Sequence, residues 1–330
     1  MNKWRWLFLR VCFSFIFLGV LFWKTDLSKF SEIFRTLDLP LFLVSLVSYT
    51  LLFIPLSYRW KLLLGALGIG VSMQRLFKIY LVGVFFNNFL PTAIGGDLVR
   101  GLDLYRFTQK GKEAAVSVMA ERFLGLAALL IIGVTALGFS YSSLQDPFLV
   151  WLILITAFGY LILLFGLATP TIFILTAGML KHMRLQWFGQ KLLKIPEAIA
   201  LYKSSLGTLI SSSILSILIQ ALTVVIYFVL SRSLHLSIPL VYLFLFFPVI
   251  SIVSMAPVSL GGLGVREGMT VYLFQKVGVE SGHALGLSLA WYSIIFLTSL
   301  LGGVVFVLRG VRELPPPPSP LRRPEHQRPS

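Results

Sequence analysis

The sequence predicts an all-α integral membrane protein, with about six full transmembrane helices plus two re-entrant broken helices in an inverted repeat. Three observations support this fold class: an apolar composition, two copies of one helix-breaking motif, and a one-sided distribution of basic residues. Of the 330 residues, 57% are hydrophobic and only 12% are charged, and the mean hydropathy is +0.89. A soluble protein carries about 25% charged residues. The composition therefore indicates a chain embedded in a membrane.

Two segments of the chain fit one pattern, in which Pro, three residues, Gly-Gly and three residues precede Arg. The two copies consist of Pro91, Gly95, Gly96 and Arg100, and of Pro257, Gly261, Gly262 and Arg266. Proline lacks an N–H and glycine readily adopts positive φ, so both interrupt a helix. Within a bilayer, interrupted backbone persists only where protein or a water-filled cavity satisfies its polar groups. We therefore expect two re-entrant segments that meet at a polar site, the alternative being ordinary tight turns at helix ends.

The apolar runs follow one another in an order that places both motifs between full crossings. The expected membrane segments are Val11–Trp23, Leu39–Tyr58, Phe77–Ile94, Ala114–Phe139, Phe148–Leu167, Leu206–Leu230, Pro239–Leu260 and Ala284–Leu308. The first resembles a signal peptide without a small-residue cleavage site and is expected to remain as an anchor. The third and the seventh lead into the two motifs. The tail 314–330 is rich in proline and arginine and is expected to be extended and disordered.

Basic residues set the expected orientation. If both motif segments return to the side they entered, most of the 28 Lys and Arg residues fall on one face of the membrane. Cytoplasmic loops carry such an excess of Lys and Arg. We therefore expect both termini in the cytoplasm and the chain in the plasma membrane, the inner membrane of a bacterium.

The same layout indicates an internal duplication. Corresponding segments and the two motifs lie about 165 residues apart. Each half contains an odd number of full crossings, so the second half must be inverted relative to the first, as in many transporters. The expected units are a first repeat over 1–142, a second, inverted repeat over 143–313, and the tail 314–330.

The motifs and the charges beside them are the candidate site for a lipid headgroup or for gating. Backbone N–H groups freed at the two glycine pairs, together with the two motif arginines, are expected to form an anion cradle. Charge beside a membrane segment usually has a partner or a function. The candidate residues are Asn88, Pro91, Gly95, Gly96, Asp97, Arg100, Glu121, Arg122, Pro257, Gly261, Gly262, Arg266 and Glu267.

Simpler roles compete with this interpretation for several residues. Arg100 could be an anchor that reaches the lipid headgroups. Glu121 and Arg122 are adjacent in a helix and point to different faces, so each is expected to pair elsewhere. Asp103 and Glu113 are expected on a solvated face.

Several functional classes are not expected from the sequence. Cys12 is the single cysteine, so an intramolecular disulfide is impossible, and the four histidines lack metal-ligand spacing. The net charge of +15 is not gathered in a basic domain with interleaved aromatics, so no nucleic-acid partner is expected. The chain has no GxxxxGK[ST] motif for ATP. We expect no cofactor, no metal and no catalytic residues.

Three ordered motifs carry a resemblance to a known family. The segments NNFLPTAIGGDLVR from Asn87, ERFLGL from Glu121 and PVSLGGLGVREG from Pro257 resemble the transmembrane region of lysylphosphatidylglycerol synthases and related flippase-like proteins. The resemblance implies movement of a lipid between leaflets. Full-length synthases of this family add a soluble domain that transfers lysine from tRNA to phosphatidylglycerol. Only 22 residues follow Leu308 here, so aminoacyl transfer is not expected.

The expected function is translocation of a phospholipid or an anionic, lipid-linked carrier between leaflets. Two alternatives remain open at this point. The chain could be a membrane-embedded enzyme of aminoacyl-phospholipid or other headgroup modification, with Asp97, Glu121 and Glu267 as acid or base. It could also be an accessory subunit of a separately encoded enzyme.

Overall fold

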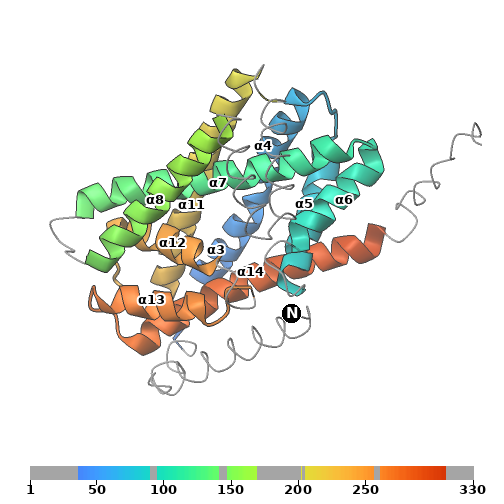
Figure 1. Cartoon of the computed structure of the whole chain (residues 1–330). Helices are drawn as coiled ribbons and strands as arrows, with labels where there is room; N and C mark the ends of the chain where they lie inside the picture. Colours follow the sequence, from blue (N-terminus) through green and yellow to red (C-terminus); the bar gives the residue numbers. More distant parts are fainter. Residues whose placement is uncertain are drawn as a thin grey trace, which may run out of the picture.

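The computed structural model describes residues 36–89, 95–140, 147–168, 202, 205–255 and 261–309, and all regular structure in these ranges is helical. Figure 1 shows the helices, which keep its labels here. Their bounds are α3 Leu39–Leu51, α4 Phe53–Ala66, α5 Met73–Phe89, α6 Gly95–Thr108, α7 Gly111–Ser140, α8 Pro147–Ala168, α11 Leu206–Ser233, α12 Leu240–Ser254, α13 Val265–Gln275 and α14 Ser281–Arg309.

Four helical segments in the described ranges are long and apolar enough to cross a membrane. They are Leu39–Ala66, Gly111–Phe139, Leu206–Ser233 and Ser281–Arg309, each of 28 or 29 residues. At 1.5 Å per residue, each reaches beyond a hydrocarbon core of about 30 Å. Of the six expected full spans, these four agree with the structure. The expected span Phe148–Leu167 coincides with α8, and Val11–Trp23 lies outside the described residues.

The first of these segments is two helices in line, α3 and α4, separated by Leu52. Pro55 lies in the first turn of α4 and has no N–H to donate to the preceding turn. The segment also continues to Ala66, past its expected end at Tyr58. This extension places Arg59 inside the membrane segment instead of at its polar edge, because the side chain finds buried partners described below.

Each motif joins two packed helices. The first motif lies between α5 and α6, and the second lies between α12 and α13. Within each pair the two helices contact one another. The expected interruption of the apolar run is therefore present in both copies, while Pro91 and Pro257 themselves lie outside the described residues.

Equivalent helices of the two halves make equivalent contacts, each with a helix of the other half. Helix α5 packs against α14, and its counterpart α12 packs against α7. Gly302 of α14 lies beside Leu81 of α5, and Gly133 of α7 lies beside Pro248 of α12. In sequence, Pro248 lies 167 residues after Leu81, and Gly302 lies one position before the residue that the helix starts align with Gly133. These matching contacts agree with the expected duplication.

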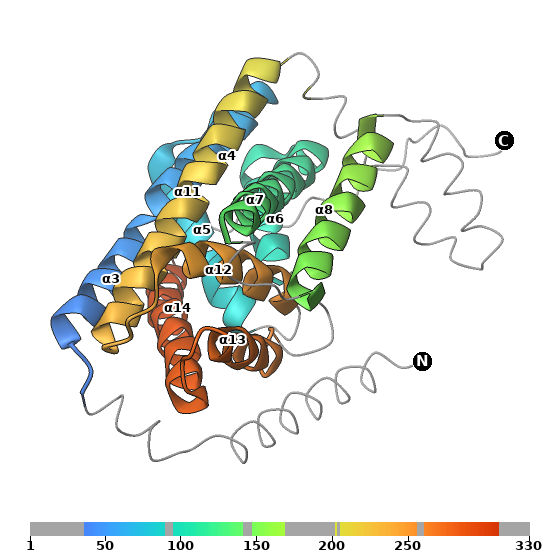
Figure 2. The ribbon, with the colours of Figure 1, turned by 90° about the vertical axis from the view of Figure 1, so that its left-hand side faces the viewer.

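Corresponding helices run in opposite directions, which makes the repeat an inverted one. The α3–α4 segment lies along α11 (Figure 2). The Asp38 N–H before α3 donates to the Ser233 carbonyl at the end of α11, at 2.8 Å. Farther along, Arg59 contacts Ser216. α7 and α14 also run in opposite directions (Figure 1). The boundaries near residues 142 and 313 stay predictions.

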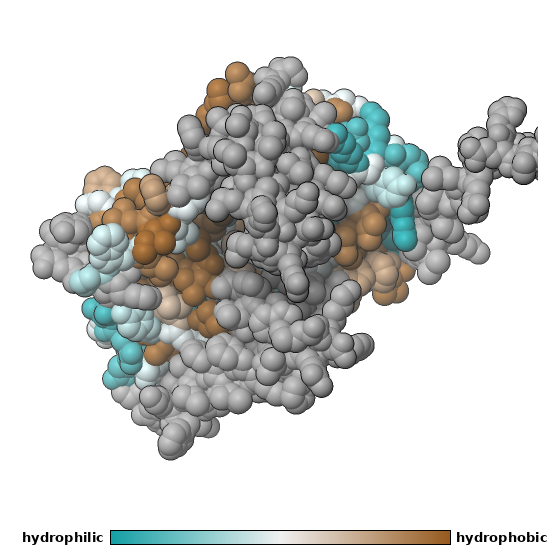
Figure 3. Space-filling model, in the orientation of Figure 1, coloured by the Kyte–Doolittle hydropathy of each residue, from teal (hydrophilic) through white to brown (hydrophobic). Residues whose placement is uncertain are grey.

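The surface has the pattern of a protein surrounded by lipid. In Figure 3 hydrophilic residues gather near α6 at one edge and near α13 at the opposite edge, and hydrophobic patches lie beside each group. On α11 the exposed apolar side chains recur at helical spacing, at Leu206, Ile210, Ile214, Leu218, Leu222 and Val225. Such a continuous apolar stripe is expected where a helix faces acyl chains.

Candidate functional site

The first motif begins with a close crossing of α5 and α6. A side chain added at Gly96 would overlap the carbonyl oxygen of Gly83, so glycine is required where the two backbones touch. The Gly96 N–H donates to Oδ1 of Asn87, at 2.8 Å. Gly95 and Gly96 are therefore the first residues of α6. The backbone N–H of Gly96, expected to be free for an anion, is already used.

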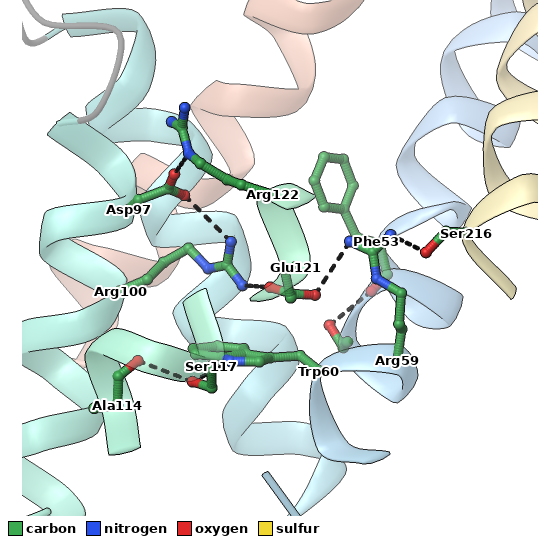
Figure 4. Close-up of polar contacts among 11 residues, drawn as sticks. Phe53, Arg59, Trp60, Asp97, Arg100, Ala114, Ser117, Glu121, Arg122 and Ser216 are labelled. Carbon is green, nitrogen blue, oxygen red and sulfur yellow. Dashed lines mark hydrogen bonds and ion pairs between the residues drawn. The ribbon is translucent and has the colours of Figure 1, made fainter. Parts of the chain in front are cut away.

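Arg100 and Arg59 approach the Glu121 carboxylate from two sides (Figure 4). Arg100 on α6 donates from Nη2 to Oε2 of Glu121 on α7. Arg59 on α4 donates from Nη2 to Oε1, at 3.3 Å, and from Nη1 to Oγ of Ser216 on α11, at 2.8 Å. Glu121 is only 3% exposed. Glu121 thus joins α4, α6 and α7 of the first repeat, and Arg59 links this group to α11 of the second.

Asp97 extends this network toward the surface. Arg100 donates from Nη1 to its Oδ1, at 3.3 Å, and Arg122 donates from Nε to its Oδ2. Arg122 is the half-exposed member, with 46% of its side chain accessible. Within the part of the chain that the structure describes, three arginines face these two carboxylates. Moving an ion out of water costs several kcal/mol even after relaxation, so this arrangement requires the dense pairing that it shows.

Aromatic rings hold the Arg100 guanidinium in place. Its Cζ lies 4.2 Å from the ring centroid of Trp60 and 3.7 Å from that of Tyr80. A guanidinium over a ring face is attracted by the negative centre of the π-system. Trp60 is itself fixed, because its Nε1 donates to Oγ of Ser117, at 3.0 Å. Arg100 is therefore a buried group and not the headgroup anchor that the sequence left possible.

The second motif has a different geometry. Gly261, Gly262 and Gly264 have φ of 58°, 82° and 85°, a left-handed conformation that glycine adopts without strain. α13 begins directly after them, and Glu267 in its first turn accepts from the Gly264 N–H at 2.6 Å. Arg266 donates from Nε to the other carboxylate oxygen, at 3.0 Å. Glu267 is fully buried.

A cavity of about 160 Å³ lies beside Arg266. Its lining comes from α11, α12, α13 and α14 and consists of Tyr227, Phe247, Ile250, Ser251, Ser254, Arg266, Thr270, Ser288, Trp291 and Ile295. The Ser288 hydroxyl is buried and has no hydrogen-bond partner in the structure. Buried polar groups normally have one.

A row of aromatic contacts along α14 connects Arg266 with the end of α5. Arg266 lies over the ring of Tyr292, with Cζ 4.6 Å from the centroid. The rings of Tyr292 and Phe296 are 6.4 Å apart, and Phe296 is 6.1 Å from Phe89 at the end of α5. The charges nevertheless form two groups, because no ion pair between described residues joins the Arg100 cluster to Arg266.

Most candidate residues can be placed. Glu121 and Arg122 pair with different partners, as their adjacent positions predicted. Asn88 lies at the end of α5, with a buried Nδ2 that has no partner in the structure. One expectation was wrong: Asp103 is not simply solvated, because Arg309 at the end of α14 donates to it at 2.8 Å. No cluster of three or more potential metal ligands occurs among the described residues.

Sequence reasoning missed three residues of this site. Arg59 lies just past the expected end of the Leu39–Tyr58 span, although its position between apolar residues was a signal for a buried charge. Ser216 looked like one of many membrane serines. Gly83, which allows α6 to approach, gives no signal without its partner Gly96.

Comparison with known proteins agrees with this architecture. The family model for the lysylphosphatidylglycerol synthase TM region matches residues 7–303. The chain belongs to this family. The match covers every helix of both repeats up to the last turns of α14. No solved structure matches the chain.

Similar members of the family come from archaea. A UPF0104 membrane protein of Methanothermobacter thermautotrophicus is 25% identical, over 84% of this chain and 86% of its own length. The UPF0104 membrane protein MJ1595 of Methanocaldococcus jannaschii is 20% identical, over 91% and 94%. PH1989 of Pyrococcus horikoshii is 22% identical, over 87% and 92%. These names state a membrane location and no activity.

Proposed function

We propose that this protein translocates a phospholipid, or another lipid with an anionic phosphate-bearing headgroup, between the leaflets of the membrane. The observation that carries the proposal is the equivalent placement of two buried arginines, Arg100 and Arg266, directly after the interruptions of two inverted helix pairs. Inverted repeats with interrupted helices recur in proteins that expose one site alternately to the two sides of a membrane.

The charges support a phosphate-bearing substrate. Three arginines surround the carboxylates of Glu121 and Asp97, and Arg266 lines a cavity. Guanidinium groups bind phosphate oxygens through paired, charge-assisted hydrogen bonds. Broken helices in the interior of the fold would give the headgroup a polar route that the acyl chains do not offer.

The family supports the same function. The family is that of the membrane region of a lipid synthase, which favours a role in lipid handling. In this proposal the chain lies in the plasma membrane with both termini in the cytoplasm. The edge over α6 is then cytoplasmic, and the edge over α13 faces outward.

A transport assay tests the proposal. The purified chain is placed in liposomes that contain a fluorescent phospholipid, and a membrane-impermeant reductant reports the fraction in the outer leaflet over time. Wild-type protein is expected to accelerate exchange, and Arg266→Gln is expected to remove most of the acceleration. Arg106→Gln is the matched control, because Arg106 is an exposed residue near the end of α6.

Two outcomes would overturn the proposal. One is exchange no faster than in protein-free liposomes. The other is a change in the mass of the recovered lipid, which would identify an enzyme of headgroup modification instead of a translocator.

A further inference from the structure

The space between the aromatic residues near the motif arginine differs between the two repeats. In the first repeat, Arg100 lies over Trp60 and Tyr80. The starts of α3 and α11, and of α5 and α12, are 167 residues apart, and this offset gives Tyr227 and Phe247 in the second repeat. Both line the cavity beside Arg266. The space filled by an arginine in the first repeat is therefore open in the second.

The sequence explains this asymmetry. Arg100 is drawn across α5 by Glu121 on α7. In α14 the residue at the same distance from the helix start is Trp291, which carries no charge. Glu267 takes the place of that carboxylate, and it directly follows Arg266 in the chain. Arg266 therefore turns toward Glu267 and leaves the aromatic walls uncovered.

The cavity presents hydrogen-bond donors to its contents. Arg266 uses Nε and Nη2 for Glu267, and the hydrogen bonds between described residues leave its Nη1 unused. The Ser288 hydroxyl is buried, unpartnered and part of the cavity wall. A guanidinium edge and a serine hydroxyl on one small cavity are a donor set for phosphate oxygens.

We propose that this cavity, lined by Arg266 and Ser288 in the second repeat alone, binds a single phosphate group. The inference rests on the proposed function and names the binding site within it. A cavity of about 150 Å³ holds a molecule of the size of benzene. The cavity of about 160 Å³ therefore admits one phosphate and little more, so a bulky sugar headgroup has to remain outside it.

Calorimetry on the full chain in detergent tests this site with two short-chain probes. Dioctanoyl phosphatidic acid and dioctanoylglycerol differ only in the phosphate. The first is expected to bind saturably and the second is not. Inorganic phosphate distinguishes a free-phosphate site from a lipid site, because a lipid site gains affinity from the acyl chains and binds the free ion at least tenfold more weakly.

Variants of one helix separate the cavity from general effects. Ser288→Val fills the cavity with methyl groups and is expected to weaken binding of phosphatidic acid at least tenfold. Ser288→Ala removes one hydrogen bond and is expected to weaken it about 2- to 12-fold. Ser293→Val is the matched control, because Ser293 donates to the Leu289 carbonyl of the same helix and does not line the cavity.

The outcomes separate the site from the transport function. Unchanged binding in folded Ser288→Val, equal binding of dioctanoylglycerol, or binding of choline in place of phosphatidic acid overturns the site. If Ser288→Val does not fold, unchanged binding by Ser288→Ala overturns it. Binding with the expected pattern, but without translocation by wild-type protein, leaves the site and overturns the proposed function. Translocation that persists after binding at this cavity is lost leaves the transport function and overturns the claim that transport uses this site.

Discussion

Glu121 on α7 accepts a hydrogen bond from Arg100 on α6 inside the fold, where both residues are at most 5% exposed. Loss of Arg100 and loss of Glu121 leave different ion pairs in the cluster. Without Arg100, Glu121 still pairs with Arg59, and Asp97 still pairs with Arg122. Without Glu121, Arg59 and Arg100 lose the carboxylate between them.

This difference predicts that the Glu121→Gln variant is less stable than the Arg100→Gln variant. Glu121→Gln leaves buried positive charge uncompensated and is expected to cost about 3–5 kcal/mol. Arg100→Gln is expected to cost less, because each carboxylate keeps one arginine. Thermal unfolding in detergent measures both, with Arg106→Gln as the exposed control. A larger loss for Arg100→Gln than for Glu121→Gln would contradict the charge balance described here.

The crossing of α5 and α6 gives a second prediction. Gly96→Ala places a methyl group against the backbone oxygen of Gly83, which cannot rotate away. We expect a loss of about 1–3 kcal/mol or more. Gly101→Ala on the same helix meets nothing within 4 Å, and is expected to gain about 0.5–1 kcal/mol. Equal stability of the two variants would show that α6 does not lie this close to α5.

The inverted repeat predicts which residues share a side of the membrane. Arg106→Cys and Gln275→Cys, each on a Cys12→Ser background, place one thiol near the end of α6 and one at the end of α13. An impermeant thiol reagent is expected to label the second from outside intact cells and the first only from the cytoplasmic side. Labelling of both from the same side would rule out this topology.

Much of the fold could be predicted because long apolar runs bounded by polar residues indicate membrane helices. The starts of α11 and α8 lie within a residue of their expected positions, at Leu206 and Pro147. The inverted repeat followed from the two motifs and the spacing between them. The role of Gly96 was harder to predict, since a glycine pair can break a helix or permit close packing. The structure uses Gly96 for packing and Gly262 for a left-handed turn.

The composition of the charge cluster could be predicted only in part. Asp97, Arg100, Glu121 and Arg122 stood out as charges beside apolar runs. Their pairing depends on how α4, α6 and α7 cross, and no local pattern encodes that. The cavity beside Arg266 was beyond sequence reasoning, because it results from a missing carboxylate on α14 and from an arginine that turns to its own neighbour.

The most direct test is the rate at which proteoliposomes move a fluorescent phosphate-bearing lipid, compared between Ser288→Val and Ser293→Val. Both variants add the same atoms to α14, and only the first fills the cavity beside Arg266. The expected result is wild-type exchange with Ser293→Val and at least tenfold slower exchange with Ser288→Val. Equal rates for the two folded variants would contradict the claim that this cavity binds the lipid phosphate during transport.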